Sequence, residues 1–231
     1  RGSSEKGLES VPIRVFLSNP MLLRIGLLIV FTSLATGALE AGVPLLLSEP
    51  PLSLGPGGIS LVILLLVLLQ GMGGWWWGRL VDRKEPTRYM LMGWVGVTLS
   101  LLIAGMIASK GSSREFLYFI ILMLCVFQFS VAAAQIPMLP MIDTATSQAY
   151  GRGGSGLAFG AFSTAWAIGT LIGPLAIGIL NDITGSWATA LGMLALPGIL
   201  GLTITLRHRE SLMDCYQQEM QNRSKKESAE E

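Results

Sequence analysis

The sequence predicts an all-α membrane protein with six transmembrane helices. Hydrophobic residues make up 51% of the 231 residues and charged residues only 13%, whereas a soluble domain carries roughly 25% charged residues. Mean hydropathy is +0.58. The apolar stretches each approach the ~20 residues that a helix needs to cross ~30 Å of hydrocarbon. A multi-spanning helical protein is therefore expected.

Short polar or charged turns separate the apolar stretches. The predicted spans are residues 21–47, 59–77, 89–108, 116–142, 156–180 and 187–206. They make up a six-helix domain over 19–206, between a linker at 1–18 and a charged tail at 207–231. Asn19 and Pro20 supply a helix cap and a first-turn proline, and Pro137 with Pro140 should interrupt the fourth span late.

The distribution of cations predicts the orientation. An even number of spans puts both ends of the chain on one side of the membrane, and only Lys110 and Arg114 of the 16 Lys and Arg residues then fall on the other side. The positive-inside rule makes both termini cytoplasmic. A plasma membrane and a vesicle membrane both remain open.

Several classes of function lack support in the sequence. A net charge of +1 indicates no nucleic-acid-binding surface. No nucleophile–base set, metal-ligand spacing or phosphate loop is evident, so we expect no enzyme, cofactor or metal site. Cys125 lies in an apolar run and Cys215 in the polar tail, which predicts different environments and no disulfide framework.

A charged turn, GRLVDRKEPTR, joins the second and third spans. It is either a solvated turn that fixes orientation by charge, or a conformational latch in which Asp82 meets a helix N-terminus and basic partners. Asp143, at the end of the fourth span, is placed to join such a network. The latch residues would be Gly78, Leu80, Asp82, Arg83, Arg88 and Asp143.

The turn resembles the signature loop of the major facilitator superfamily, G-x-L-x-D-R after the second of six spans. The element Gly169 to Gly178, GTLIGPLAIG, resembles the glycine–proline element of the eleventh helix in the drug/proton antiporter and vesicular amine transporter branch. After Arg83 the chain departs from the family pattern of a glycine and paired cations. The acids of the amine transporters align with Val131 and Ser163, so we do not transfer their amine chemistry.

The resemblance implies a 3+3 inverted-repeat half of a major facilitator fold, the C-terminal six helices of a twelve-helix carrier. A faint internal repeat agrees with it, since Gly78-Arg-Leu-Val-Asp82 and Gly178-Ile-Leu-Asn-Asp182 close the second and fifth spans. The helix-packing or bending residues would be Gly169, Gly173, Pro174 and Gly178.

A polar stripe marks the first span, where Ser33, Thr36, Gly37 and Glu40 share one helix face. An acid within a membrane helix costs ~2.5–3.5 kcal/mol at the centre, so Glu40 calls for water, a partner or a proton, or else lies near the outer mouth. In the family the first and fourth spans of each half line the cavity. The candidate path for substrate or protons is Ser33, Thr36, Glu40, Gln128, Gln135 and Ser163.

The expected function is secondary active transport of a small organic molecule, in the form of proton-coupled export by a multidrug-type antiporter. The alternative is a non-transporting membrane subunit, or a truncated half-protein that only associates with partner helices. Expected partners are the lipid bilayer, a small-molecule substrate, protons and an N-terminal six-helix half that this chain lacks, with no nucleic acid.

Overall fold

Helices account for all regular structure in the part of the chain that the computed structural model describes, residues 19–50, 52–81, 85–109, 114–150 and 155–218. Six stretches of helix within these ranges are long and apolar enough to cross a membrane, which confirms the all-α membrane class. The helices are α2 (Pro20–Ser48), α3 (Pro56–Val81), α4 (Pro86–Ser109), α5 (Arg114–Gln135), α6 (Met138–Tyr150), α7 (Ser155–Thr184), α8 (Trp187–Met193) and α9 (Ala195–Arg207).

Prolines begin three of these helices. Pro20, Pro56 and Pro86 each occupy a first turn, where the missing N–H of proline leaves no helical hydrogen bond unmade. At α2 the Asn19 side-chain oxygen also accepts from the backbone N–H of Met21 at 2.9 Å and of Leu22 at 3.3 Å. The second and third helices therefore start before their purely apolar stretches at 59 and 89.

Prolines also divide two of the membrane-length stretches. The fourth is interrupted between α5 and α6 because Pro137 and Pro140 cannot donate to the preceding turn, as the sequence predicted. The sixth is interrupted at Leu194, three residues before Pro197, and this break was not foreseen. Helix α6 also continues to Tyr150, through residues 143–150, which lie beyond the predicted end of the fourth span at 142.

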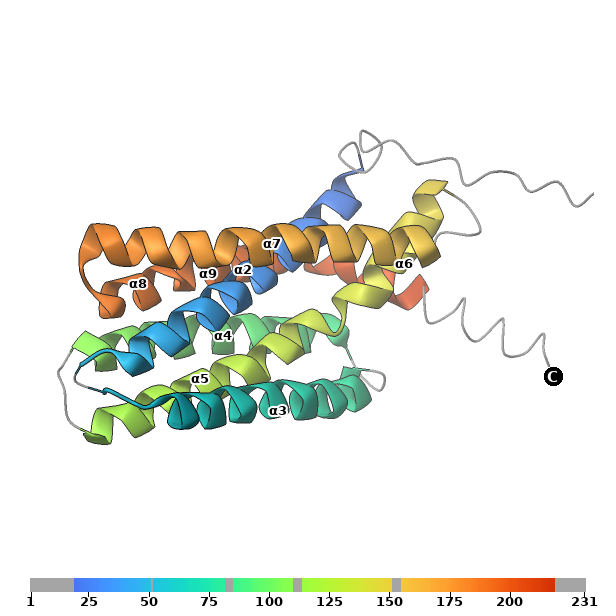
Figure 1. The fold of residues 1–231 in the computed structure, drawn as a ribbon. Coiled ribbons are helices and arrows are strands. Elements are labelled where there is room, and N and C mark those ends of the chain that lie inside the picture. The colour runs from blue at the N-terminus through green and yellow to red at the C-terminus, as the bar shows by residue number, and fades with distance from the viewer. Residues whose placement is uncertain (1–18, 51, 82–84, 110–113, 151–154, 219–231) are drawn as a thin grey trace, which may run out of the picture.

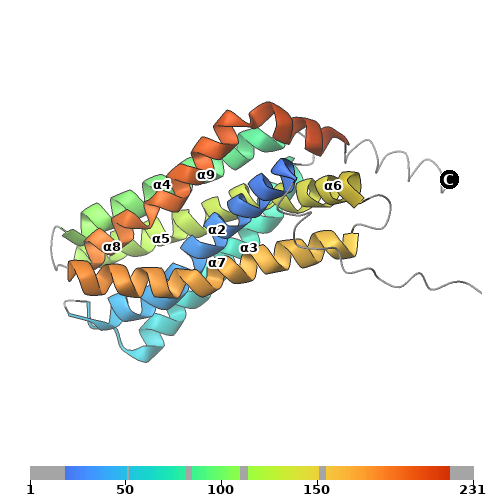
Figure 2. The same ribbon diagram turned by 90° about the horizontal axis from the view of Figure 1, so that it is seen from above.

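Helix α2 lies at the centre of the bundle (Figures 1 and 2). It packs on α7 along most of its length and also contacts α3, α5, α6 and α9. Two-thirds (67%) of its most apolar window is buried, against 17% for α3 and 22% for α7. Helices α3 and α7 therefore carry much of the outward-facing apolar surface, while α4 packs on α5, α8 and α9.

A further helical segment, 209–218, follows α9 within the region that the sequence predicted to be only a charged tail. Its inner face is made by Leu212, Cys215 and Tyr216, each no more than 5% exposed. The Cys215 thiol donates to the Met141 carbonyl of α6 at 3.3 Å, and the Gln148 and Gln218 amides are hydrogen-bonded. This segment is thus packed against α6.

Candidate functional site

On the side of α2 that faces α7, the backbones of the two helices are in direct contact. A Cβ atom at Gly173 of α7 would lie 2.4 Å from the Leu34 carbonyl oxygen and 2.5 Å from the Ala38 nitrogen. A Cβ at Gly169 would lie 1.8 Å from the Ser33 hydroxyl, and one at Gly37 would lie 2.9 Å from the Thr170 Cα. Only glycine permits these approaches, so Gly169 and Gly173 of the predicted element form a packing surface, whereas a Cβ at Gly178 would meet nothing within 4 Å beyond its own helix backbone.

Two hydroxyls of the predicted polar stripe are buried. Ser33 and Thr36 are 0% and 1% exposed. The Ser33 hydroxyl donates to the Ile29 carbonyl at 2.9 Å, and the Thr36 hydroxyl donates to the Thr32 carbonyl at 2.9 Å. Because their own helix satisfies them, these hydroxyls need no ligand.

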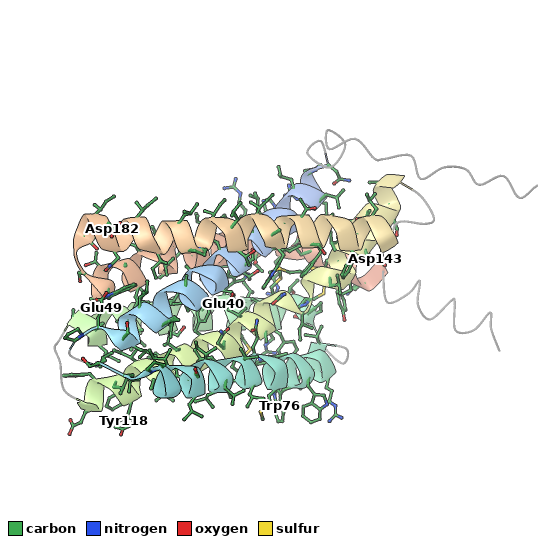
Figure 3. The ribbon with its side chains drawn as sticks, viewed as in Figure 1. Glu40, Glu49, Trp76, Tyr118, Asp143 and Asp182 are labelled. Atoms are coloured by element: carbon green, nitrogen blue, oxygen red, sulfur yellow. The ribbon has the colours of Figure 1, made fainter. Side chains whose placement is uncertain are left out.

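Glu40 is different, since it lines a small cavity between α2, α3 and α5. Figure 3 shows it between Glu49, near one end of the bundle, and Asp143, toward the other. The cavity has a volume of about 80 Å³. Its lining residues are Leu39, Glu40, Val43, Ile63, Leu66, Val67, Leu124 and Gln128. Polar groups therefore enter it only from α2 and α5.

Gln128 of α5 is the second polar residue of this cavity. Its side chain is 4% exposed, and its Oε1 atom accepts no hydrogen bond from the described residues. A buried polar atom without a partner costs roughly 1–3 kcal/mol. The amide therefore has a free acceptor in the cavity that Glu40 also lines, where a water or a protonated group would be stabilised.

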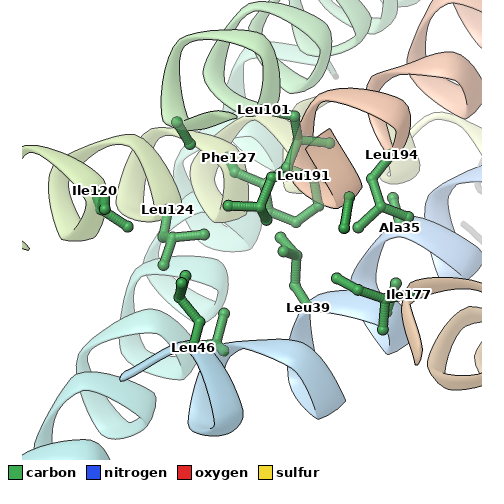
Figure 4. Close-up of a cluster of buried hydrophobic side chains, with 14 of the residues drawn as sticks. Ala35, Leu39, Leu46, Leu101, Ile120, Leu124, Phe127, Ile177, Leu191 and Leu194 are labelled. Carbon is green, nitrogen blue, oxygen red and sulfur yellow. The ribbon is translucent and has the colours of Figure 1, made fainter. Parts of the chain in front are cut away.

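Part of the cavity wall belongs to the buried core, whereas Ile63 and Val67 of α3 are 38% and 57% exposed. Figure 4 shows Leu39, Leu46 and Leu124 among the cluster of buried side chains that joins α2 to α5, and Leu66 of α3 belongs to it too. A water occupies about 30 Å³ in the liquid, whereas pockets for drug-sized molecules have roughly 300–1,000 Å³. The cavity can hold a few waters and is too small for an organic substrate.

The remaining candidate residues of the predicted path lie outside this cavity. Gln135 is half-buried at the end of α5, and Ser163 is exposed on α7. The sequence thus predicted the two polar residues that line the cavity, together with four that do not. The six apolar lining residues carried no signal, because they are indistinguishable from other leucines, isoleucines and valines of the spans.

The predicted latch is described only in part. Asp82 and Arg83 lie outside the described residues. Gly78 and Leu80 are half-buried at the end of α3, Arg88 is exposed at the start of α4, and Asp143 is half-buried in α6. The latch therefore stays a prediction.

The loop region contains an ion pair that the sequence did not suggest. Arg209, after α9, contacts Glu85, just before α4, with 2.9 Å between Nη2 and Oε2. The side chains are 51% and 56% exposed, so the pair adds little to stability. It shows that the segment 209–218 meets the charged turn itself, at Glu85.

Some tryptophans at the helix ends are packed against neighbouring helices, and others are exposed. The Trp77 indole N–H donates to the Phe129 carbonyl at 3.0 Å, and its ring packs on Tyr89 and Phe129. Trp75 and Trp76 are 59% and 54% exposed, as expected of an interfacial aromatic belt. At the opposite end, the Trp187 indole N–H donates to Glu49 at 2.7 Å.

Comparison with known families decides the classification. The family model described as Major Facilitator Superfamily matches residues 25–214. The chain belongs to the major facilitator superfamily. Proteins of the major facilitator superfamily carry small molecules across membranes and are not enzymes. No curated protein and no solved structure matches the chain.

Proposed function

We propose that this chain forms the C-terminal half of a proton-coupled carrier that exports a small organic molecule. The observation that carries the proposal is the shared cavity of Glu40 and Gln128, which places one acid and one amide oxygen without a hydrogen-bond partner among apolar side chains. An acid at membrane depth is stabilised by water, by a partner or by taking up a proton. Glu40 would exchange the proton, and Gln128 would accept a hydrogen bond from its protonated form or from a bridging water.

The size of the cavity separates the proton from the substrate in this proposal. About 80 Å³ accommodates water but no organic molecule, so substrate would pass outside the cavity, along the exposed side of Glu40. Sites of secondary carriers lie near the midplane between repeats. Export, rather than uptake, rests on the resemblance to the drug/proton antiporter branch.

The 3+3 arrangement has support in the helix contacts. The first span packs on the fifth (α2 on α7), and the second packs on the fourth (α3 on α5). If spans one to three are equivalent to spans four to six, exchanging the two triplets turns the first of these pairs into the second, as expected of a repeat. The third span also packs on the sixth, α4 on α8 and α9. The cytoplasmic placement of both termini continues to rest on the positive-inside rule.

A second six-helix half is the proposed partner. The faces of α3 and α7 that point away from α2 and α5 are rich in exposed apolar side chains, such as Leu64 (53%), Leu68 (54%), Leu171 (71%) and Leu175 (61%). Lipid alone could cover them, yet a carrier needs a second wall to enclose a path. Transport would therefore require the complementary half.

The test is substrate-dependent proton movement in liposomes loaded with a pH-sensitive dye. The chain would be reconstituted alone and within a complete carrier, and a panel of amphipathic organic cations and neutral molecules would be added. The proposal expects proton movement with some of these compounds from the complete carrier and none from the chain alone. If the complete carrier moves no compound, a non-transporting membrane subunit becomes the better description.

A further inference from the structure

A groove separate from the Glu40 cavity lies between the start of α4 and the start of the segment 209–218. Its volume is about 640 Å³. The residues that line it are Glu85, Arg88, Leu91, Met92, Val95, Gly96 and Arg209. The charged residues come from the helix ends, and the apolar ones follow along α4, so the groove has a charged end and an apolar wall.

The charged end offers two guanidinium groups to an anion. Arg88 is exposed and forms no ion pair with any described residue. Arg209 is held by Glu85 at 2.9 Å, which uses one of its five N–H donors and leaves the others available. Glu85 therefore pairs with one of the two arginines, and the groove keeps one net positive charge.

The apolar wall continues onto the outward face of α4. From Arg88 to Gly96 the helix rises about 12 Å. Met92 and Val95 are 54% and 41% exposed, and Leu99, one turn further, is 51% exposed. Because these side chains lie on a span that must face hydrocarbon, the groove opens toward the bilayer as well as toward water.

We propose that this groove binds one anionic phospholipid. Its phosphate would lie between Arg88 and Arg209, where guanidinium groups form charge-assisted hydrogen bonds with phosphate oxygens. An acyl chain would lie along Leu91, Met92 and Val95. Basic pockets between membrane helices are suited to acidic head groups, and the apolar wall favours a lipid over a soluble phosphate.

The groove also joins two parts of the chain. Arg88 belongs to α4, whereas Arg209 is the first residue of the segment whose Leu212, Cys215 and Tyr216 pack against the bundle. A phosphate shared by both arginines would therefore strengthen the attachment of segment 209–218 to α4, beyond the exposed Arg209–Glu85 pair.

The test is retention of lipid by the purified, delipidated protein in neutral detergent, measured by native mass spectrometry during titration with phosphatidylglycerol or phosphatidylcholine. Phosphatidylglycerol should bind with a stoichiometry of one and be preferred. Arg88→Gln should weaken its binding about tenfold, because it removes a hydrogen bond between charged groups. Equal binding of the two lipids would overturn the proposal.

Arg79→Gln is the matched control. Arg79 is an exposed arginine near the end of α3, where its guanidinium lies 3.9 Å above the Trp75 ring, and it does not line the groove. Its loss should leave phosphatidylglycerol binding unchanged. If Arg79→Gln weakens binding as much as Arg88→Gln, the effect is general charge attraction and the groove is not the site.

Two further measurements separate a lipid from a soluble anion. Val95→Trp places a bulky side chain on the apolar wall and keeps both arginines, so it should reduce phosphatidylglycerol binding. Glycerol 3-phosphate, which carries the phosphate without acyl chains, should fail to displace the lipid. Displacement by glycerol 3-phosphate, together with an unaffected Val95→Trp variant, would show a soluble anion site and overturn the lipid assignment.

Discussion

The two sides of α2 are built in opposite ways. Toward α7, Gly37 and Gly173 bring the two backbones together and leave no space for a single added carbon. Toward α3 and α5, Glu40 and Gln128 line a cavity of about 80 Å³ among large apolar side chains. The side toward α7 has no room for a water or a ligand, whereas the side toward α3 and α5 has a cavity and a hydrogen-bond acceptor without a partner.

This difference indicates on which side of α2 the contacts can change during function. Close-packed backbones have no alternative arrangement at low cost, because protein interiors resist changes of even one methylene. A cavity with polar groups can gain or lose water and protons without repacking. We therefore expect α2 and α7 to behave as one rigid pair, and chemistry to act on the α3 and α5 side.

The largest effect is expected from Gly173→Ala. The new Cβ would meet backbone atoms of α2 that cannot rotate away, so α2 and α7 must separate, at a cost of about 1–3 kcal/mol or more. The melting temperature of the detergent-solubilised protein should fall, together with transport by a complete carrier.

Gly178→Ala is the control on the same helix. A Cβ at Gly178 would meet no atom within 4 Å beyond the backbone of its own helix, and alanine is favoured over glycine in helices by about 0.5–1 kcal/mol. This variant should melt at an equal or higher temperature. Equal losses in both variants would mean that glycine matters here for backbone flexibility and not for close packing.

Glu40→Gln should have the next largest effect, on function alone. The substitution keeps the shape and removes the titration, so a complete carrier should fold and insert normally but lose nearly all of its response to a pH gradient. Substrate counterflow, which needs no net proton movement, should persist. The measurement is uptake against external pH in liposomes.

Glu49→Gln is the matched acid on the same stretch. Glu49 caps α2, accepts the Trp187 indole N–H at 2.7 Å and does not line the Glu40 cavity. Glutamine preserves an acceptor for Trp187, so the pH profile should stay that of the parent. A parent-like profile for Glu40→Gln would place the coupling acid elsewhere.

The smallest effect is expected from Gln128→Leu. Leucine removes the amide oxygen that lacks a partner from an apolar wall, which should stabilise the protein by about 1 kcal/mol while lowering pH-driven transport. Gln135→Leu, at a half-buried position outside the cavity, should do neither. A lower melting temperature for Gln128→Leu would show that the amide has a partner in the membrane.

The fold was predictable because span length and hydropathy depend on local composition. Pro137 and Pro140 likewise predicted the break between α5 and α6, because the missing N–H of a proline removes a hydrogen bond to the preceding turn of the same helix. Pro197 offered the same signal for the break at Leu194, yet Pro44 and Pro174 lie within continuous helices, so proline alone does not decide.

The site was less predictable, because burial depends on which helix packs against which face. Ser33, Thr36 and Glu40 share a spacing, but packing buries the first two, Ser33 against Gly169 of α7, and leaves Glu40 exposed. The docked segment 209–218 does have a sequence signal, because Leu212, Cys215 and Tyr216 lie at helical spacing among charged residues.

The buried thiol of Cys215 has a practical consequence for labelling studies. The chain has two cysteines, and Cys215 is 5% exposed with its sulfur directed to the Met141 carbonyl, while Cys125 is half-buried in α5. A water-soluble maleimide should therefore react slowly with the folded natural protein. New cysteines placed near Glu40 or along the outer face of α3 can then report accessibility over a low background, with both native cysteines kept in place.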